Sequence, residues 1–136
     1  MGRCVEVPYE KDEQTAFVQW CHLKQIPVHH SGNEIGGSTR DVKIRAIKMK
    51  KMGTSKGFWD LVVFVPIKGI TGEIDAYQQI MIEMKRQHGG TMSTEQKKWQ
   101  KIYETAGIPC KVCKGAKEAI AFVEQFFYNK DDDSVF

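Results

Sequence analysis

Two apolar runs in the middle of the chain constrain its fold more than any other feature. The first run spans residues 60–65 and begins with Asp60, and the second spans residues 78–85 and ends with Glu83 and Lys85. Residues two apart share one face of a strand, so Glu83 and Lys85 point the same way. If the two runs pair as a hairpin, Asp60 meets them at one edge of a small sheet.

Two carboxylates and a lysine at a sheet edge are suited to metal-dependent hydrolysis of phosphodiesters. Carboxylate oxygens are ligands that Mg²⁺ prefers, and a lysine can orient a water molecule or offset phosphate charge. Each of the three residues, taken alone, could be a polar end of a strand or half of a salt bridge. A charge entering an apolar strand is costly unless it is paired or metal-bound. Three converging charges therefore favour a site.

Length and composition indicate one domain. The chain has 136 residues, of which 41% are hydrophobic, and this is enough for a substantial core. We expect a nuclease-sized core over residues 10–128 and an acidic tail over residues 129–136. No apolar run approaches the roughly 18–20 residues needed to cross a bilayer, and the N-terminal residues lack the apolar stretch of a signal peptide. We therefore expect a soluble, cytoplasmic protein.

Positive charge is concentrated just before Asp60, although the net charge is only +3. A basic segment beside a candidate phosphodiester site is suited to holding a polyanion. The alternative is an ordinary solvated helix face, and the position of the segment favours nucleic acid. The basic residues are Arg40, Lys43, Arg45, Lys48, Lys50, Lys51 and Lys56.

The pattern of apolar and turn-forming residues predicts an α/β fold with a small mixed β-sheet flanked by helices. Strand 60–65 reads as buried on both faces, and Pro66, Gly69 and Gly72 mark the connection that follows it. Ser93 and Gln96 have the spacing of a capping box, which opens a helix. Helices are predicted over residues 10–24, 40–52, 93–106 and 116–128, and strands over 26–30, 60–65, 78–85 and 109–113. The apolar stripe of the first helix is predicted to comprise Ala16, Phe17, Trp20, Cys21 and Lys24.

These residues resemble the PD-(D/E)xK nuclease superfamily and, within it, the virus-type replication-repair nuclease (VRR-NUC) domain. The resemblance extends from Glu10 to about Tyr128, and it implies a restriction-endonuclease-like core. One departure is Trp59, where the family usually has a proline before the aspartate. The motifs that carry the resemblance are Glu10…Gln14, Asp60, Ile82-Glu83-Met84-Lys85, the Gly89-Gly90 turn with Ser93-x-x-Gln96-x-x-Trp99, and the closing Gly107-Ile108-Pro109-x-x-Val112-Cys113.

The resemblance implies a role for each site residue. It places a divalent metal ion, Mg²⁺ or Mn²⁺, on Asp60, Glu83 and the backbone carbonyl of Met84, with Lys85 beside the nucleophilic water. It makes Gln96 a site residue that orients Lys85 or a phosphate, whereas the residues themselves also allow a capping-box role alone.

The first helix offers two acidic candidates. The resemblance implies a glutamate that approaches the metal through water, and the Glu-x-x-x-Gln spacing selects Glu10. Glu13 lies on the same side of the helix and is close enough to substitute.

The hypothesis that follows is a metal-dependent DNA endonuclease acting on branched DNA, such as four-way (Holliday) junctions, in a bacterial or phage-infected cell. The alternatives are a nicking, flap or restriction-type nuclease, and a non-catalytic DNA-binding module. Symmetric cutting of a junction needs two incisions, so we expect a homodimer with one site per subunit. Apolar residues left over for its interface are Ile35, Ile47, Met49 and Met52.

Overall fold

The computed structural model describes residues 9–32 and 39–127, and in this part of the chain helices and strands follow the predicted order. The predicted fold class, an α/β fold with a small mixed sheet flanked by helices, is confirmed. The helices are α1 (Glu10–Leu23), α2 (Thr39–Lys51), α3 (Thr94–Thr105) and α4 (Ala116–Glu124). The strands are β1 (Val28–His30), β2 (Leu61–Lys68), β3 (Ile74–Lys85) and β4 (Cys110–Lys114).

The four strands form one sheet in the order β1-β2-β3-β4. β1, β2 and β3 are antiparallel neighbours, whereas β4 runs parallel to β3. A parallel pair needs a long crossover connection, and α3 lies within it. In the β2–β3 ladder Leu61 is opposite Ile82, so the ladder places Asp60 across from Glu83.

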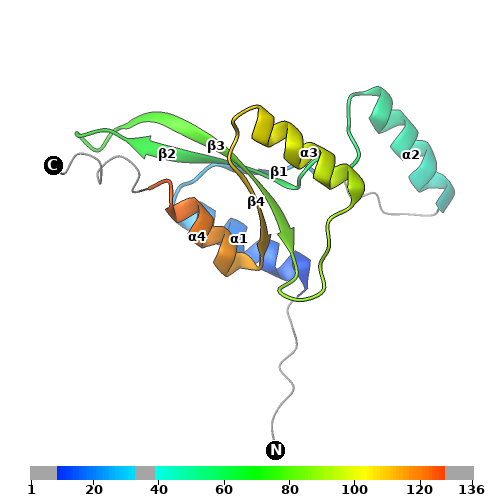
Figure 1. Cartoon of the computed structure of the whole chain (residues 1–136), viewed down its shortest axis with the longest axis horizontal. Helices are drawn as coiled ribbons and strands as arrows, with labels where there is room; N and C mark the ends of the chain where they lie inside the picture. The colour runs from blue at the N-terminus through cyan, green and yellow to red at the C-terminus, as the bar shows by residue number, and fades with distance from the viewer. Residues whose placement is uncertain (1–8, 33–38, 128–136) are drawn as a thin grey trace, which may run out of the picture.

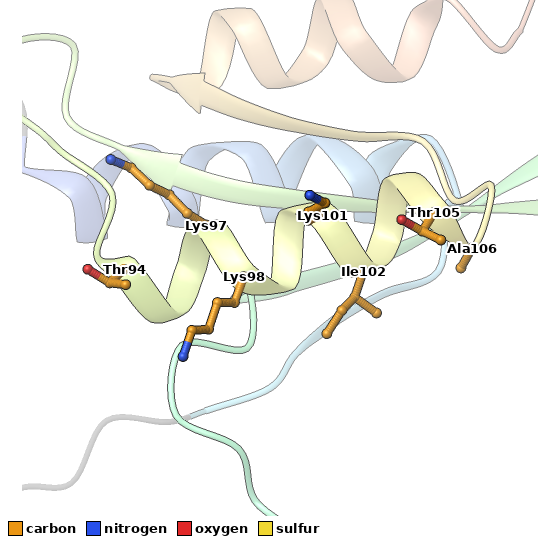
Figure 2. Close-up of a pocket in the computed structure, with 7 residues that line it drawn as sticks. All are labelled: Thr94, Lys97, Lys98, Lys101, Ile102, Thr105 and Ala106. Carbon is orange, nitrogen blue, oxygen red and sulfur yellow. The ribbon is translucent and has the colours of Figure 1, made fainter.

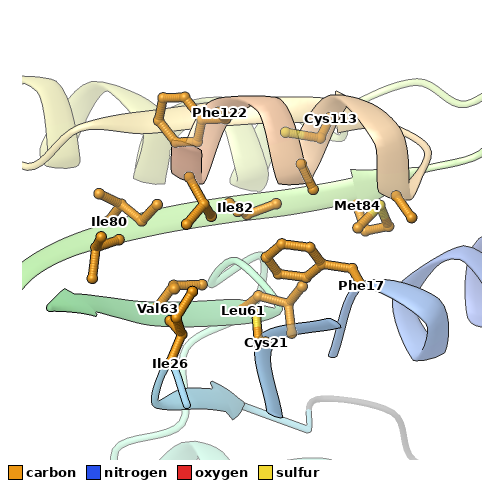
Figure 3. Close-up of a cluster of buried hydrophobic side chains, with 14 residues drawn as sticks. Phe17, Cys21, Ile26, Leu61, Val63, Ile80, Ile82, Met84, Cys113 and Phe122 are labelled. Atoms are coloured by element: carbon orange, nitrogen blue, oxygen red, sulfur yellow. The ribbon is translucent and has the colours of Figure 1, made fainter. Parts of the chain in front are cut away.

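Helices cover the two faces of the sheet unequally. α1 and α4 pack on one face, where Phe17, Leu61, Ile82 and Phe122 belong to the larger buried cluster (Figure 3). α3 packs on the other face, over a smaller cluster centred on Trp59, Met81 and Tyr103. α2 stands apart at one end of the molecule (Figure 1), and none of its residues belongs to either cluster. No helix in the described ranges is long and apolar enough to cross a membrane.

Strand β2 differs from its prediction in length and burial. Pro66 does not end it; the strand continues to Lys68, and β3 correspondingly begins at Ile74. Pro66 is tolerated because the amide of Phe64 points toward β1, as its bond to the carbonyl of Pro27 shows. The amide position of Pro66, two residues on, faces the same way, beyond the end of β1. The prediction of two buried faces was also wrong, since Phe64 is 37% exposed.

Two helix predictions were wrong in detail. α4 ends at Glu124, and the amides of Phe126 and Phe127 bond three residues back in turns; the predicted end at residue 128 lies outside the described residues. Ala16 was assigned to the apolar stripe of α1 but is exposed. The buried residues of α1 are Glu13, Phe17 and Cys21. Glu13 replaces an expected apolar residue, because its carboxylate accepts a hydrogen bond from the Ala116 amide.

Candidate metal centre

Three carboxylates converge at the end of the sheet where β2 begins and β3 ends. Oxygen atoms of Glu10, Asp60 and Glu83 all lie within 4.8 Å of one another. Asp60 immediately precedes β2, Glu83 lies in β3, and Glu10 is the first residue of α1. The backbone amide of Asp60 donates to Oε1 of Glu83 at 3.3 Å, which ties the two strands together at the site. Three hard oxygen donors at this spacing form a candidate site for a divalent metal ion.

Within this cluster, the pKa of Glu83 is shifted by burial and by its charged neighbours. Its side chain is only 1% exposed. The pKa of Glu83 is raised from 4.5 to about 7. Burial is the largest cause and the negative charge of Asp60 adds to it, while the positive charge of Lys85 lowers the pKa. A carboxylate held at such a cost is stabilised by a bound cation. The electrostatics therefore favour a cation between these acids.

Lys85 faces the same side of β3 as Glu83, as their spacing predicts. Its Nζ lies 3.3 Å from Oε2 of Glu83 and donates to Oε1 of Gln96 at 3.2 Å. The lysine is 8% exposed, so its charge is held beside the cluster with little freedom. It is therefore in place to act on a water molecule or phosphate oxygen near the acids.

Close packing of the Gly89–Gly90 turn helps to fix Lys85. A Cβ on Gly90 would lie 2.9 Å from the Cβ of Lys85 and 3.3 Å from the backbone nitrogen of Arg86. Real Cβ atoms are not found at the shorter distance, so only glycine lets the turn approach the end of β3 this closely. The Gly-Gly pair of the sequence motif thus has a packing role next to the site.

Gln96 forms the predicted capping box and also contacts two residues of the site. The backbone amide of Gln96 donates to Ser93 Oγ, and the side-chain Oε1 of Gln96 accepts from the backbone amide of Ser93 at 2.9 Å, so the capping box is confirmed. Its Nε2 also donates to Oε2 of Glu83 at 3.0 Å, while Oε1 accepts from Lys85. One side chain therefore joins the start of α3 to Glu83 and Lys85 of β3.

Sequence reasoning missed the contribution of Trp59, which stands where the related family usually has proline. Trp59 is fully buried; its amide donates to the Tyr103 hydroxyl at 3.2 Å, and its indole N–H donates to the backbone carbonyl of Gln96 at 3.0 Å. A proline could make neither bond. Trp59, the residue directly before Asp60, is thus tied by hydrogen bonds to two residues of α3, Tyr103 and Gln96. The available signal was a hydrogen-bonding aromatic residue directly before the candidate acid.

Glu10 and Glu13 have different surroundings despite their shared side of α1. Glu10 joins Asp60 and Glu83, whereas Glu13 is turned to α4. Glu13 accepts from the Ala116 amide at 3.2 Å and from Nε2 of Gln87 at 2.7 Å, so it satisfies the N-terminus of α4. Of the two candidates, only Glu10 reaches the acidic cluster.

Met84 lies between Glu83 and Lys85, with its side chain in the larger buried cluster on the opposite face of the sheet. That placement leaves only its backbone for the site. Coordination by its carbonyl stays a prediction.

The basic residues predicted to bind nucleic acid lie on α2 and on the loop after it. All seven are exposed, and six belong to α2, while Lys56 lies in the loop that leads to β2. α2 also leaves apolar residues in solvent: Ile47 is 58% exposed, and Met52, just beyond the helix, is 85% exposed. Met49 is half-buried, and Ile35 lies outside the described residues.

The described part of the chain can be compared with known proteins at this point. No protein-family model and no curated protein matches the sequence. A solved structure titled "VRR_NUC domain protein" superposes with a TM-score of 0.66, at 23% sequence identity, and the match covers 89% of each chain. The fold is that of a VRR_NUC domain protein. The resemblance to the VRR-NUC domain is thereby confirmed at the level of the fold.

Proposed function

We propose that this chain is a divalent-metal-dependent DNA endonuclease. The observation that carries the proposal is the convergence of Glu10, Asp60 and Glu83 within 4.8 Å, with Lys85 and Gln96 beside them, on a VRR_NUC fold. An acidic cluster by itself is common on protein surfaces. Here one acid is buried with a raised pKa and a buried lysine lies next to it, and such perturbed charged groups are typical of functional sites.

Each residue of the site has a defined task under this proposal. Asp60 and Glu83, with the backbone carbonyl of Met84, would hold Mg²⁺ or Mn²⁺, and Glu10 would act on the ion directly or through water. The bound ion supplies charge for the scissile phosphate and a water of lowered pKa. Lys85 donates to the attacking water or to a phosphate oxygen. Gln96 holds Lys85 and Glu83 in their relative positions.

Cleavage of labelled DNA in Mg²⁺, in Mn²⁺ and in EDTA tests the proposal. We expect cleavage only with a metal ion, and we expect Asp60→Ala to abolish it while the fold and DNA binding persist. Glu124→Ala removes an exposed carboxylate from α4 and serves as the matched control. Near-wild-type cleavage by Asp60→Ala at saturating Mg²⁺ would show that the acids are assigned wrongly. DNA binding without cleavage in any metal would favour a non-catalytic DNA-binding module.

The proposal extends to branched DNA and to a homodimer. Exposed basic residues on α2 can contact DNA beyond the scissile strand, and exposed apolar residues such as Ile47 and Met52 are available for an isologous contact. The β2–β3 hairpin offers a second apolar surface in Ile70, Ile74 and Tyr77. Light scattering at micromolar concentration, paired with a four-way-junction assay, separates a dimer that cuts symmetrically from a monomer that nicks. A monomer that makes paired cuts in one encounter would contradict the dimer.

A further inference from the structure

A groove runs between α2 and the start of α3, next to the candidate metal centre. Its volume is about 800 Å³. Residues of α2, the loop after it and the first turn of α3 line this α2–α3 groove: Ala46, Met49, Lys50, Gly53, Thr54, Ser55, Lys56, Gly57, Ser93 and Gln96. Gln96 belongs both to the groove and to the site, since its side chain contacts Glu83 and Lys85. A ligand in the groove therefore continues directly into the metal centre.

The loop side of the groove is held at both ends. The amide of Thr54 bonds to the carbonyl of Met49 at 2.9 Å, and that of Gly53 bonds to the carbonyl of Lys50 at 3.1 Å, so the loop is anchored to the end of α2. At its other end the loop meets α3, where a Cβ on Gly57 would lie 2.4 Å from the Cβ of Glu95. The groove is thus a feature of the packed structure.

Its lining combines positive charge with an apolar floor. Lys50 and Lys56 are exposed on the α2 and loop sides, and neither forms an ion pair with a carboxylate in the described ranges. Ala46 and Met49 are three residues apart on α2 and so share the face that forms the floor. Ser93 brings the N-terminus of α3, where the helix dipole favours a phosphate.

Positive charge continues along α3 beyond the groove. Lys97, Lys98 and Lys101 are exposed on this helix, and Lys98 projects toward the loop that leads from α2 into β2 (Figure 2). Glu95, against which Gly57 packs, lies three residues before Lys98 and therefore on the same side of α3. A strand leaving the groove would pass this lysine.

We propose that the α2–α3 groove holds an unpaired DNA strand beside the scissile phosphate. A duplex offers phosphates and sugars to a narrow groove, and these would lie against the floor of Ala46 and Met49. An unpaired strand offers apolar base faces to the floor and its phosphates to Lys50, Lys56 and the start of α3. Single-strand sites combine a positively charged groove with side chains against which bases pack, and in this groove those side chains are aliphatic, Ala46 and Met49. The inference rests on the proposed function and names its substrate: DNA whose strands separate next to the cut.

The test compares a splayed-arm DNA with a fully paired linear DNA of the same sequence, using the whole chain. Wild type should cleave the splayed-arm DNA with a kcat/KM roughly threefold to tenfold higher than the linear DNA, because an aliphatic contact to a base is weaker than stacking on an aromatic side chain. Met49→Glu should bring the ratio of the two kcat/KM values close to one, because a carboxylate replaces the apolar contact to the base. Met49→Ala, which retains an apolar residue, should shift the preference in the same direction.

Matched variants separate the groove from general charge effects. Ile44→Glu adds the same charge at an exposed position of α2 outside the groove lining, and should leave the preference unchanged. Lys50→Ala with Lys56→Ala should lower the preference, whereas Lys43→Ala with Lys48→Ala should weaken both DNAs alike. Circular dichroism confirms that each variant is folded.

The outcomes distinguish the two proposals. Equal cleavage of both DNAs by wild type, or equal effects of Met49→Glu and Ile44→Glu on the preference, would overturn the groove assignment and leave the nuclease proposal standing. If no DNA is cleaved, fluorescence anisotropy on the same two DNAs still decides: a preference for the splayed-arm DNA that Met49→Glu removes supports the groove, although the proposed function has then failed. No preference in that binding assay would overturn the groove assignment as well.

Discussion

Replacing Glu83 with glutamine should raise the stability of the metal-free protein relative to wild type as the pH rises, while removing its metal site. The carboxylate of Glu83 is buried beside Asp60, and its pKa is raised from 4.5 to about 7, chiefly by burial. Below pH 4.5 the carboxyl is protonated in both the folded and the unfolded chain. As the pH rises from 4.5 to 7, the unfolded chain loses this proton first, so the free energy of unfolding falls, and above pH 7 the whole penalty is present.

The size of the effect follows from the pKa. The rise corresponds to about 3 kcal/mol, and it already includes the opposing attraction of Lys85. An amide keeps the shape of the side chain without the charge, but both oxygens of Glu83 accept hydrogen bonds, so the NH2 group of a glutamine faces a donor in either orientation. That cost is the same at every pH, so the stability of Glu83→Gln relative to wild type should rise by up to about 3 kcal/mol between pH 4 and pH 8. For a chain of this length the rise corresponds to a relative Tm change of about 10 °C.

Thermal unfolding followed by circular dichroism, in EDTA and across pH 4–8, measures the difference. Mg²⁺ should then raise the Tm of the wild type at pH 8, because the ion compensates the carboxylate charge, and should raise that of Glu83→Gln much less. Glu124→Gln changes an exposed carboxylate and should stay within about 0.5 kcal/mol of wild type. A stability difference between Glu83→Gln and wild type that does not grow from pH 4 to pH 8 in EDTA would refute the reasoning.

Three further predictions concern the remaining residues of the site and the basic helix. Lys85→Ala should lower kcat by about 10²–10⁴-fold and keep metal affinity by isothermal titration, and Lys85→Arg should not restore the rate, because a planar guanidinium differs from a compact ammonium; a loss of metal binding would contradict this division of roles. Glu10→Ala should weaken metal binding, whereas Glu13→Ala should leave it intact and lower stability by about 1–3 kcal/mol, because the Ala116 amide loses its partner; the reverse pattern would exchange their roles. Replacing Lys48, Lys50 and Lys51 of α2 together with alanine should weaken DNA binding. The slope of log affinity for DNA against log salt concentration should flatten by about one unit per lost phosphate contact. An unchanged slope would make this helix a solvated surface.

Much of the site was predictable because it depends on local patterns. Alternation along a strand fixes which residues share a face, so Glu83 and Lys85 were bound to point the same way. Apolar pairing of β2 with β3 then left Asp60 opposite Glu83, as the hairpin prediction required. The capping box of Ser93 and Gln96 is equally local, since both of its bonds lie within four consecutive residues.

Strand lengths were less predictable, because they depend on neighbours. Pro66 reads as a strand end, and it is accommodated in β2 only because β1 does not extend past it. The exposure of Phe64 likewise depends on what packs over that face of the sheet. Neither fact is present in the residues around these positions.

Tertiary structure alone decided which groups meet across elements. Glu10 and Glu13 lie on the same side of α1, and the sequence pattern favours Glu10 only through a resemblance. In the structure they are separated because the N-terminal amide of α4 meets Glu13, whereas Glu10 meets the acids of the sheet. The same holds for Trp59, whose hydrogen bonds to Tyr103 and Gln96 span 44 and 37 residues. Periodicity states which side of a helix or strand a residue occupies, but the partner on that side depends on how the layers pack, and that is a property of the whole fold.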